Sequence, residues 1–156
     1  MQNVEVLVAD DCSTDHLYLV ASSISDSRLH LWQFTQNHGT VCTLNFLFEH
    51  AKGEYIATLG SDDLFYPEKL EKQLEEVLEK KPQIATAFSW ADIIDEDGRI
   101  YQSGNSIPRD VSCKQNKTPA EWCRYFFENG NTRCHSSALI RSTVQRELGE
   151  YHAKFR

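Results

Sequence analysis

The segment that decides the fold is Val4 to Asp15, which reads VEVLVADDCSTD. Its first residues are mostly apolar and β-branched, a pattern typical of a buried strand. The run ends at Asp10 and Asp11, so the strand would deliver two carboxylates to the loop at its carboxyl end. Ligands bind beyond this end of the strands in open α/β sheets. The segment therefore predicts an α/β fold with a polar ligand site beside Asp10 and Asp11.

Helical and extended patterns alternate after this segment. Apolar residues recur at helical spacing twice, and each helical pattern is followed by a short apolar or alternating run. The predicted elements are a helix over residues 17–24, a strand over 29–34, a helix over 40–51 and a strand over 54–59. Gly53 is expected to stop the second helix in a left-handed conformation. Strands that alternate with helices favour a mostly parallel sheet flanked by helices.

The later part of the chain mixes both kinds of pattern. A strongly amphipathic helix is predicted from Pro67, because proline suits the first helical position. The residues Asp95 to Gly98 indicate a hairpin turn, and Thr118 with Glu121 forms the signature of a capping box. Strands are predicted over 84–94 and 134–140.

Composition limits the classes of function. With 156 residues and 40% hydrophobic content, the chain suits one domain with one core. A net charge of −7 argues against a nucleic-acid backbone as the main partner. No apolar run approaches the roughly 20 residues needed to span a bilayer, and the start lacks the pattern of a secretory signal. A cytoplasmic location is therefore expected.

The cysteines favour neither a disulfide framework nor a zinc site. They are five, an odd number, and none are spaced as C-x-x-C. We expect reduced, mostly buried thiols that behave as small apolar side chains. These residues are Cys12, Cys42, Cys113, Cys123 and Cys134.

Four motifs follow one another in a distinctive order. They are V-x-x-x-V-A-D-D-C-S-T-D from Val4, Q-N-H-G-T from Gln36, L-N-F-L-F-E-H-A-K-G-E-Y-I-A from Leu44, and S-D-D-L-F-Y-P-E-K-L-E-K-Q from Ser61. In this order the chain resembles the family 2 glycosyltransferases, closely up to Gln73 and loosely beyond it. The resemblance implies a Rossmann-like GT-A fold. It also implies metal-dependent, inverting transfer of a sugar from a nucleotide-diphospho-sugar, with UDP as the expected nucleotide, to a saccharide or lipid-linked acceptor.

The resemblance places Asp10 and Asp11 beside the nucleotide. A carboxylate can accept hydrogen bonds from the imide N–H of uracil or from ribose hydroxyls. The alternative is that one of the pair only caps the next helix, a role that Ser13 or Asp15 can also fill. Asn37 belongs to an N-x-G turn at the edge of the expected nucleotide pocket, and a plain helix-entry turn is the competing interpretation.

Asp62 and Asp63 resemble the metal-binding D-x-D signature of the family, with Gly60 where the first aspartate usually stands. Mg²⁺ or Mn²⁺ prefers oxygen ligands and often takes one or two protein carboxylates, with phosphate and water completing the shell. Asp62 is the expected ligand, and Asp63 is expected on the metal or on the ribose. The competing interpretation is that both only favour the start of the following helix.

The acceptor side is less well defined by the residues. His135 is a candidate for contact with the acceptor or the diphosphate, although a lone histidine is more often structural. The resemblance places a first strand before Met1 and the catalytic base beyond Arg156, so the chain is expected to be part of a larger GT-A domain. Residues 1–95 would form its nucleotide-sugar and metal-binding half, and residues 96–156 would begin its acceptor-side half.

Three alternatives compete with an active transferase. A signalling receiver domain needs a lysine at the end of an apolar strand, whereas Lys114 lies in a polar loop. A nucleotidyltransferase needs an early glycine-rich, basic loop that this chain lacks. A non-catalytic fragment that binds a sugar nucleotide or a partner protein is the more serious alternative. The partners expected of an active protein are the donor, the acceptor, the inner face of the membrane through segments outside this chain, and a second copy.

Overall fold

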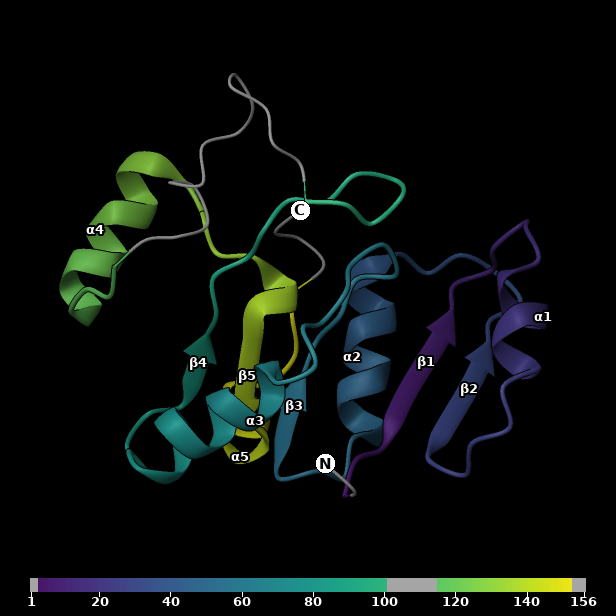
Figure 1. Cartoon of the computed structure of the whole chain (residues 1–156), viewed down its shortest axis with the longest axis horizontal. Helices are drawn as coiled ribbons and strands as arrows, with labels where there is room; N and C mark the ends of the chain where they lie inside the picture. The colour runs from purple at the N-terminus through teal and green to yellow at the C-terminus, as the bar shows by residue number, and fades with distance from the viewer. Residues whose placement is uncertain (1–2, 101–114, 153–156) are drawn as a thin grey trace. The chain divides into compact units, whose positions relative to one another are not determined.

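The structure is a computed structural model that describes residues 3–100 and 115–152. Cys113 and Lys114 lie outside the described residues. The described chain contains both helices and strands, which confirms the predicted α/β class (Figure 1). In chain order the elements are β1 (Val6–Asp10), α1 (Leu17–Ser22), β2 (Leu29–Gln33), α2 (Thr40–His50), β3 (Tyr55–Ala57), α3 (Lys69–Gln73), a π-helical turn (Leu74–Glu79), β4 (Thr86–Phe88), α4 (Pro119–Asn129), a 3₁₀ turn (His135–Ser137), β5 (Ala138–Arg141) and α5 (Ser142–Leu148).

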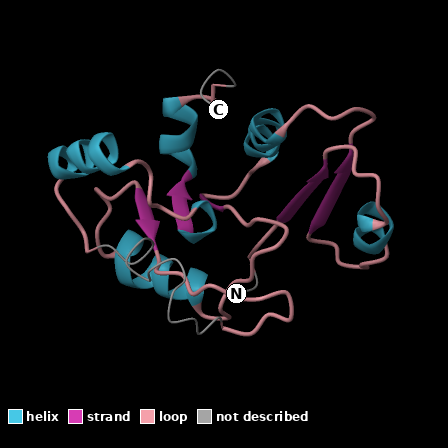
Figure 2. Ribbon diagram, turned by 90° about the horizontal axis from the view of Figure 1, so that it is seen from above, coloured by secondary structure: helices cyan, strands magenta, loops and turns pink. Residues whose placement is uncertain are grey.

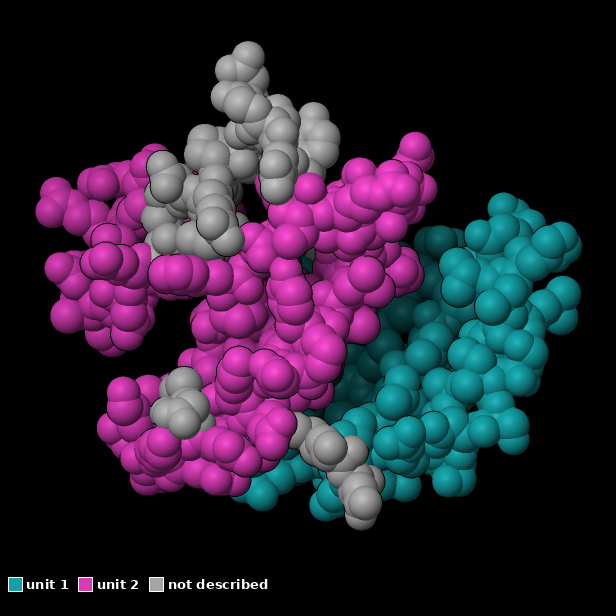
Figure 3. Space-filling model, viewed as in Figure 1, with its two compact units in different colours: residues 1–56, 140–156 teal, residues 57–139 magenta. Residues whose placement is uncertain are grey.

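The chain divides into two compact units, which Figure 3 shows in different colours. Unit 1 comprises Met1–Ile56 with Ile140–Arg156, and unit 2 comprises Ala57–Leu139. These units follow compactness rather than function. The predicted functional halves, residues 1–95 and 96–156, therefore stay a prediction.

Unit 1 is built around a parallel pair of strands. β1 and β2 run side by side from Val6 opposite Leu29 to Asp10 opposite Gln33 (Figure 2). α2 packs against β1, and α1 packs against β2. The ring of Phe46 on α2 meets the ring of Trp32 on β2 edge to face, with 5.4 Å between their centroids. Edge-to-face contacts of this kind add to the apolar packing of a helix on a sheet.

The end of α2 differs from the sequence prediction. The helix stops at His50, where a stop was expected, but Gly53 does not adopt the predicted left-handed conformation. Instead, the carboxylate of Glu5 accepts hydrogen bonds from the backbone N–H groups of Lys52, at 2.7 Å, and Gly53, at 2.9 Å. A side chain from the start of the chain therefore holds the segment that follows the helix.

α5 is an element that the sequence patterns did not predict. Its first residue, Ser142, is 1% exposed and donates its backbone N–H to the carbonyl of Glu54 at 2.9 Å. Beyond the helix, the backbone N–H and C=O of Tyr151 both bond the side-chain amide of Asn45, at 2.9 Å each. Asn45 thus fastens the segment after α5 to α2, and this is a structural role.

Most buried residues of unit 2 lie on α3, the π-helical turn, β4 and the start of β5. The three-stranded sheet has the strand order β3-β5-β4, and the unit boundaries along the chain fall within β3 and within β5. The side-chain amide of Gln73 is buried, and it donates to the carbonyls of Ala87, at 3.0 Å, and Ser137, at 2.9 Å. Leu78 is fully buried, and Ala138 is 2% exposed. One glutamine therefore ties a helix to two neighbouring segments.

Several predicted boundaries in unit 2 are wrong. The helix begins at Lys69 rather than at Pro67, the strand predicted over 84–94 is regular only over Thr86–Phe88, and residues 135–137 form a 3₁₀ turn before β5. The hairpin is confirmed, because Ile94 bridges Ile100 in antiparallel fashion. The capping box at Thr118 and Glu121 is confirmed at the start of α4.

Two further expectations concern the whole described chain. The free cysteines in the described residues are exposed or half-buried, so the expectation of mostly buried thiols is wrong. Among the described residues, none of the helices has the length and apolar character required to cross a membrane.

Candidate functional site

Asp10 ends β1 and is held on both of its carboxylate oxygens. It is 7% exposed, and it accepts hydrogen bonds from the backbone N–H of Ser13, at 3.0 Å, and from the side-chain amide of Gln33, at 3.2 Å. The hydrogen bonds from Ser13 hold the pKa of Asp10 below its ordinary value, with a smaller contribution from Gln33. Asp10 is therefore ionised at neutral pH and shapes the loop that follows β1.

Asp11 joins two motifs that lie far apart in the sequence. Its carboxylate accepts the backbone N–H groups of His38 and Gly39, each at 2.8 Å. The side-chain amide of Asn37 donates to the backbone carbonyl of Asp11 at 3.1 Å. The residue between Asp11 and Ser13, Cys12, has a φ of 64°, an uncommon left-handed conformation for a residue with a side chain. The predicted nucleotide residues Asp10, Asp11 and Asn37 thus lie together in unit 1.

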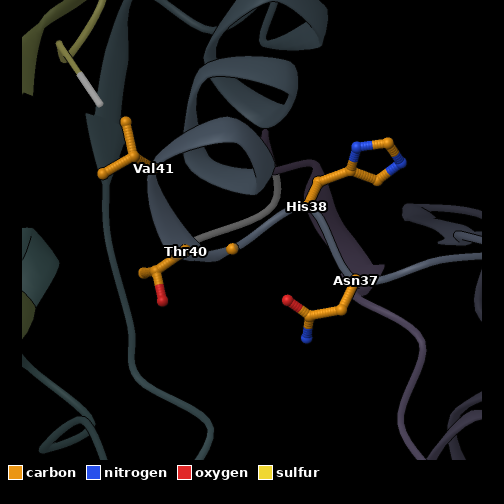
Figure 4. Close-up of a pocket in the computed structure, with 5 residues that line it drawn as sticks. Asn37, His38, Thr40 and Val41 are labelled. Atoms are coloured by element: carbon orange, nitrogen blue, oxygen red, sulfur yellow. The ribbon is translucent and has the colours of Figure 1, made fainter. Parts of the chain in front are cut away.

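A pocket of about 380 Å³ opens beside this turn, where α2 begins (Figure 4). It is lined by Asn37, His38, Gly39, Thr40 and Val41. Figure 4 shows the amide of Asn37 and the hydroxyl of Thr40 on the same side of the chain. Gly39 has a φ of 81°, which a residue with a side chain rarely adopts. The first turn of a helix presents N–H groups and a partial positive charge, so the pocket suits a polar or anionic group.

Asp62 and Asp63 follow β3 in unit 2, and their carboxylates converge over Gly60. A β-carbon added to Gly60 would lie 2.9 Å from Oδ2 of Asp63 and 3.0 Å from Oδ1 of Asp62. The first contact is closer than real β-carbons show and the second is unusually tight, so with an aspartate at this position the carboxylates of Asp62 and Asp63 would have to shift. Gly60 stands where the signature usually has its first aspartate, and the carboxylates of Asp62 and Asp63 occupy the space that a side chain there would fill.

The loop that carries these carboxylates is fastened to the 3₁₀ turn before β5. The hydroxyl of Ser136 accepts the backbone N–H of Gly60 at 3.0 Å and donates to Oδ2 of Asp63. The hydroxyl of Thr58 donates to the backbone carbonyl of His135 at 2.8 Å. The structure thus brings His135 and the acidic pair into one neighbourhood. Ser136 is a residue that the sequence interpretation missed, because a serine in a C-H-S-S run has no distinguishing pattern.

Basic side chains in unit 2 lie against aromatic rings. The guanidinium of Arg133 is 4.0 Å from the ring centroid of Trp122 on α4. The amine of Lys69 lies 4.2 Å from the ring centroid of Phe65, is buried, and has no hydrogen-bond partner within the described residues. Burial lowers the pKa of Lys69 to about 8, and it also lowers the pKa of His135. His135 is therefore mainly neutral at neutral pH.

The acidic pair over Gly60 is a suitable donor set for a hard divalent cation. Within residues 3–100 and 115–152, no three His, Cys, Asp or Glu side chains gather closely enough to hold a metal ion alone. Mg²⁺ and Mn²⁺ are commonly held by one or two protein carboxylates, with phosphate and water completing the shell. Two carboxylates converging on one point fit this pattern.

The fold and these residues define an α/β protein with acidic pairs after two of its strands. A family model described as glycosyl transferase family 2 matches residues 1–146. The chain therefore belongs to glycosyltransferase family 2.

Similar proteins include a protein named as the teichuronic acid biosynthesis glycosyltransferase TuaG of Bacillus subtilis, 35% identical over 96 residues, which are 60% of this chain and 37% of the relative. The uncharacterized glycosyltransferase MJ1057 of Methanocaldococcus jannaschii is 32% identical over 123 residues, 79% of this chain and 39% of the relative. The succinoglycan biosynthesis protein ExoO of Rhizobium meliloti is 35% identical over 96 residues, 62% of this chain and 27% of the relative. The chain thus spans less than half the length of these relatives.

Proposed function

We propose that this chain is the nucleotide-sugar-binding and metal-binding part of an inverting, metal-dependent glycosyltransferase with a mostly parallel GT-A sheet. The donor is a UDP-linked sugar, the acceptor is a saccharide or a lipid-linked saccharide, and the product enters polysaccharide biosynthesis. One observation carries the proposal: Asp62 and Asp63 converge over Gly60 in a chain that matches family 2 over residues 1–146. The names of TuaG and ExoO, which refer to teichuronic acid and succinoglycan, support the class of product.

In unit 1, Asp10 and Asp11 would meet the nucleotide while they also hold their loop. An ionised carboxylate has about four lone-pair sites, so each oxygen that accepts one hydrogen bond can accept a second. The depressed pKa of Asp10 keeps it in the accepting form for a uracil imide N–H or a ribose hydroxyl. Asn37 would add its amide at the edge of the adjoining pocket. These side chains would bind and orient the nucleotide.

In unit 2, Asp62 and Asp63 would hold Mg²⁺ or Mn²⁺. Bound there, the cation would neutralise the negative charge that builds up on the leaving diphosphate. Asp62 is the proposed principal ligand, and Asp63 would ligate the cation or accept a ribose hydroxyl. Gly60 supplies no carboxylate. The ribose contact that an aspartate at this position would make would therefore come from Asp62 or Asp63.

His135 is the proposed acceptor-side residue. Its lowered pKa leaves the imidazole neutral at neutral pH, so a ring nitrogen can accept a hydrogen bond from a hydroxyl. Inversion also requires a general base within hydrogen-bond reach of the acceptor hydroxyl. We assign this role to none of the described residues. We also propose that the whole protein is cytoplasmic and attaches peripherally to the inner face of the membrane. A second copy of the protein is a further proposed partner, in a homodimer.

Calorimetric titration with UDP tests the proposal. We expect binding in the presence of Mn²⁺ and a marked loss of affinity when the metal is chelated, with AMP as the control nucleotide. Binding without transfer from a UDP-sugar would favour the non-catalytic sugar-nucleotide-binding alternative. Absence of UDP binding at every Mn²⁺ concentration would refute the assignment of a nucleotide site.

A further inference from the structure

The Ser136 hydroxyl forms hydrogen bonds with both the backbone of Gly60 and the carboxylate of Asp63. Because it accepts the backbone N–H of Gly60, its own proton is free to point at Asp63, to which it donates. The three residues come from two segments 73 to 76 positions apart. The hydroxyl therefore bridges the backbone under the acidic pair to one carboxylate of that pair.

The 3₁₀ turn that carries Ser136 is itself anchored on several sides. Ser137 is 3% exposed, its hydroxyl donates to the carbonyl of Cys134 at 2.7 Å, and its carbonyl accepts the backbone N–H of Ser89 at 3.1 Å. The amide of Gln73 donates to the same carbonyl at 2.9 Å. Ser136 is thus presented from a buried, hydrogen-bonded base rather than from a free loop.

Two neighbouring carboxylates tend to separate, because like charges repel. No hydrogen bond to the carboxylate of Asp62 is found in the part of the chain that the structure describes, whereas Asp63 receives one from Ser136. Asp63 is therefore the member of the pair with a fixed position. A charge-assisted hydrogen bond from a hydroxyl is strong enough to select one side-chain conformation.

We infer that Ser136 is a positioning residue, which holds the carboxylate of Asp63 beside that of Asp62 so that the two meet at one divalent cation. The inference rests on the proposed function of the acidic pair. Ser136 acts through Asp63, and it is not assigned a contact with the cation or with the nucleotide. Outer hydrogen-bond partners of this kind typically change metal affinity by about 10- to 100-fold.

The test measures Mn²⁺ affinity directly, from the electron paramagnetic resonance signal of free Mn²⁺, with UDP present at a fixed concentration. We expect Ser136→Ala to weaken Mn²⁺ binding about tenfold and Ser136→Thr, which keeps the hydroxyl, to remain close to the unmodified protein. Ser137→Ala is the matched control, because it removes a neighbouring hydroxyl that bonds only the backbone. Equal losses in the Ser136→Ala and Ser137→Ala variants would show that the turn, and not the Ser136 hydroxyl, sets the affinity.

A double-mutant cycle with Asp63→Asn separates an action through Asp63 from a general weakening. If Ser136 acts through Asp63, the combined variant should bind Mn²⁺ no more weakly than Asp63→Asn alone. Additive losses, or an unchanged affinity in Ser136→Ala, would overturn the inference while leaving the proposed function intact. Failure of the unmodified protein to bind Mn²⁺ with UDP would overturn both.

Discussion

The two acidic pairs of this chain have the same composition but opposite surroundings. In unit 1, each carboxylate of Asp10 and Asp11 accepts two hydrogen bonds, and three of these four donors are backbone N–H groups. In unit 2, Asp62 and Asp63 converge over Gly60, and Ser136 is the one side-chain donor that reaches them from the described residues. Among the described residues, the first pair thus receives four hydrogen bonds and the second pair receives one.

This difference means that the pair in unit 1 has a structural role that the pair in unit 2 lacks. Backbone donors that reach Asp11 stabilise the folded chain whether or not a ligand is present. The carboxylates of Asp62 and Asp63 receive only the hydrogen bond from Ser136 among the described residues, so most of their lone pairs are available to a ligand. Substitutions of Asp10 or Asp11 should therefore lower stability in addition to any effect on nucleotide affinity, whereas substitutions of Asp62 or Asp63 should change ligand affinity with little effect on stability. The following variants test that difference.

The largest expected effect is on metal affinity at Asp62. Asp62→Asn should weaken Mn²⁺-dependent UDP binding by more than the roughly 10- to 100-fold loss typical of an outer-shell partner, because it removes the proposed ligand itself. The urea midpoint should stay unchanged or rise, since a repulsive charge is lost. Calorimetry and urea unfolding give the two values. Asp97→Asn, an exposed partner of Arg99, is the control and should affect neither. If Asp62→Asn lost much stability but still bound UDP normally, the pair in unit 2 would have a structural role and not the proposed binding role.

The next effect is on stability at Asp11. Asp11→Ala leaves the N–H groups of His38 and Gly39 without their acceptor, so we expect a loss of about 1–2 kcal/mol in the free energy of unfolding. Urea unfolding at neutral pH measures it, with Asp62→Ala as the matched control in the other pair. If both alanine variants lose the same stability, the two pairs do not differ in the way proposed here.

A smaller effect is expected at Gly60. Gly60→Ala places a β-carbon against the carboxylates of Asp62 and Asp63, which must rotate away. An off-rotamer side chain costs about 0.5–1.5 kcal/mol, which corresponds to an affinity for Mn²⁺ about two- to tenfold weaker. Because flexible side-chain ends can move, stability should hardly change. Calorimetric titration measures the Mn²⁺ affinity of this variant. An unchanged affinity would show that cation binding does not require the carboxylates of Asp62 and Asp63 to converge over Gly60.

The smallest effect is a pH dependence at Asp10. Its pKa is lowered in the folded chain, so the ionised carboxylate stabilises the fold above the ordinary aspartate pKa, and this contribution is lost as the pH falls through the folded value. The difference in unfolding free energy between the unmodified protein and Asp10→Asn should therefore shrink from about pH 6 to about pH 2. Urea unfolding at both values measures this difference. A constant difference would show that the charge of Asp10 is not what stabilises the loop.

Local signals in the sequence predicted much of the fold. α2 occupies nearly the predicted range, and the capping box starts α4 where Thr118 and Glu121 indicated. Elements whose regularity depends on their neighbours were predicted poorly. A strand was expected over 84–94, but the regular strand covers only Thr86–Phe88. The length of a strand depends on its pairing partners and not on apolar character alone. α5 was missed altogether.

Of the candidate site, the sequence by itself determined the acidic residues and their order along the chain, since strand ends and turns follow from short-range patterns. Only the tertiary structure decided which carboxylates are satisfied. The bonds from Asp11 to the turn at His38, from Asn45 to Tyr151 and from Ser136 to Asp63 join residues 27, 106 and 73 positions apart. Hydrogen bonds between residues so far apart in the sequence form only when packing brings two segments together. Local sequence patterns do not show which segments will pack against each other.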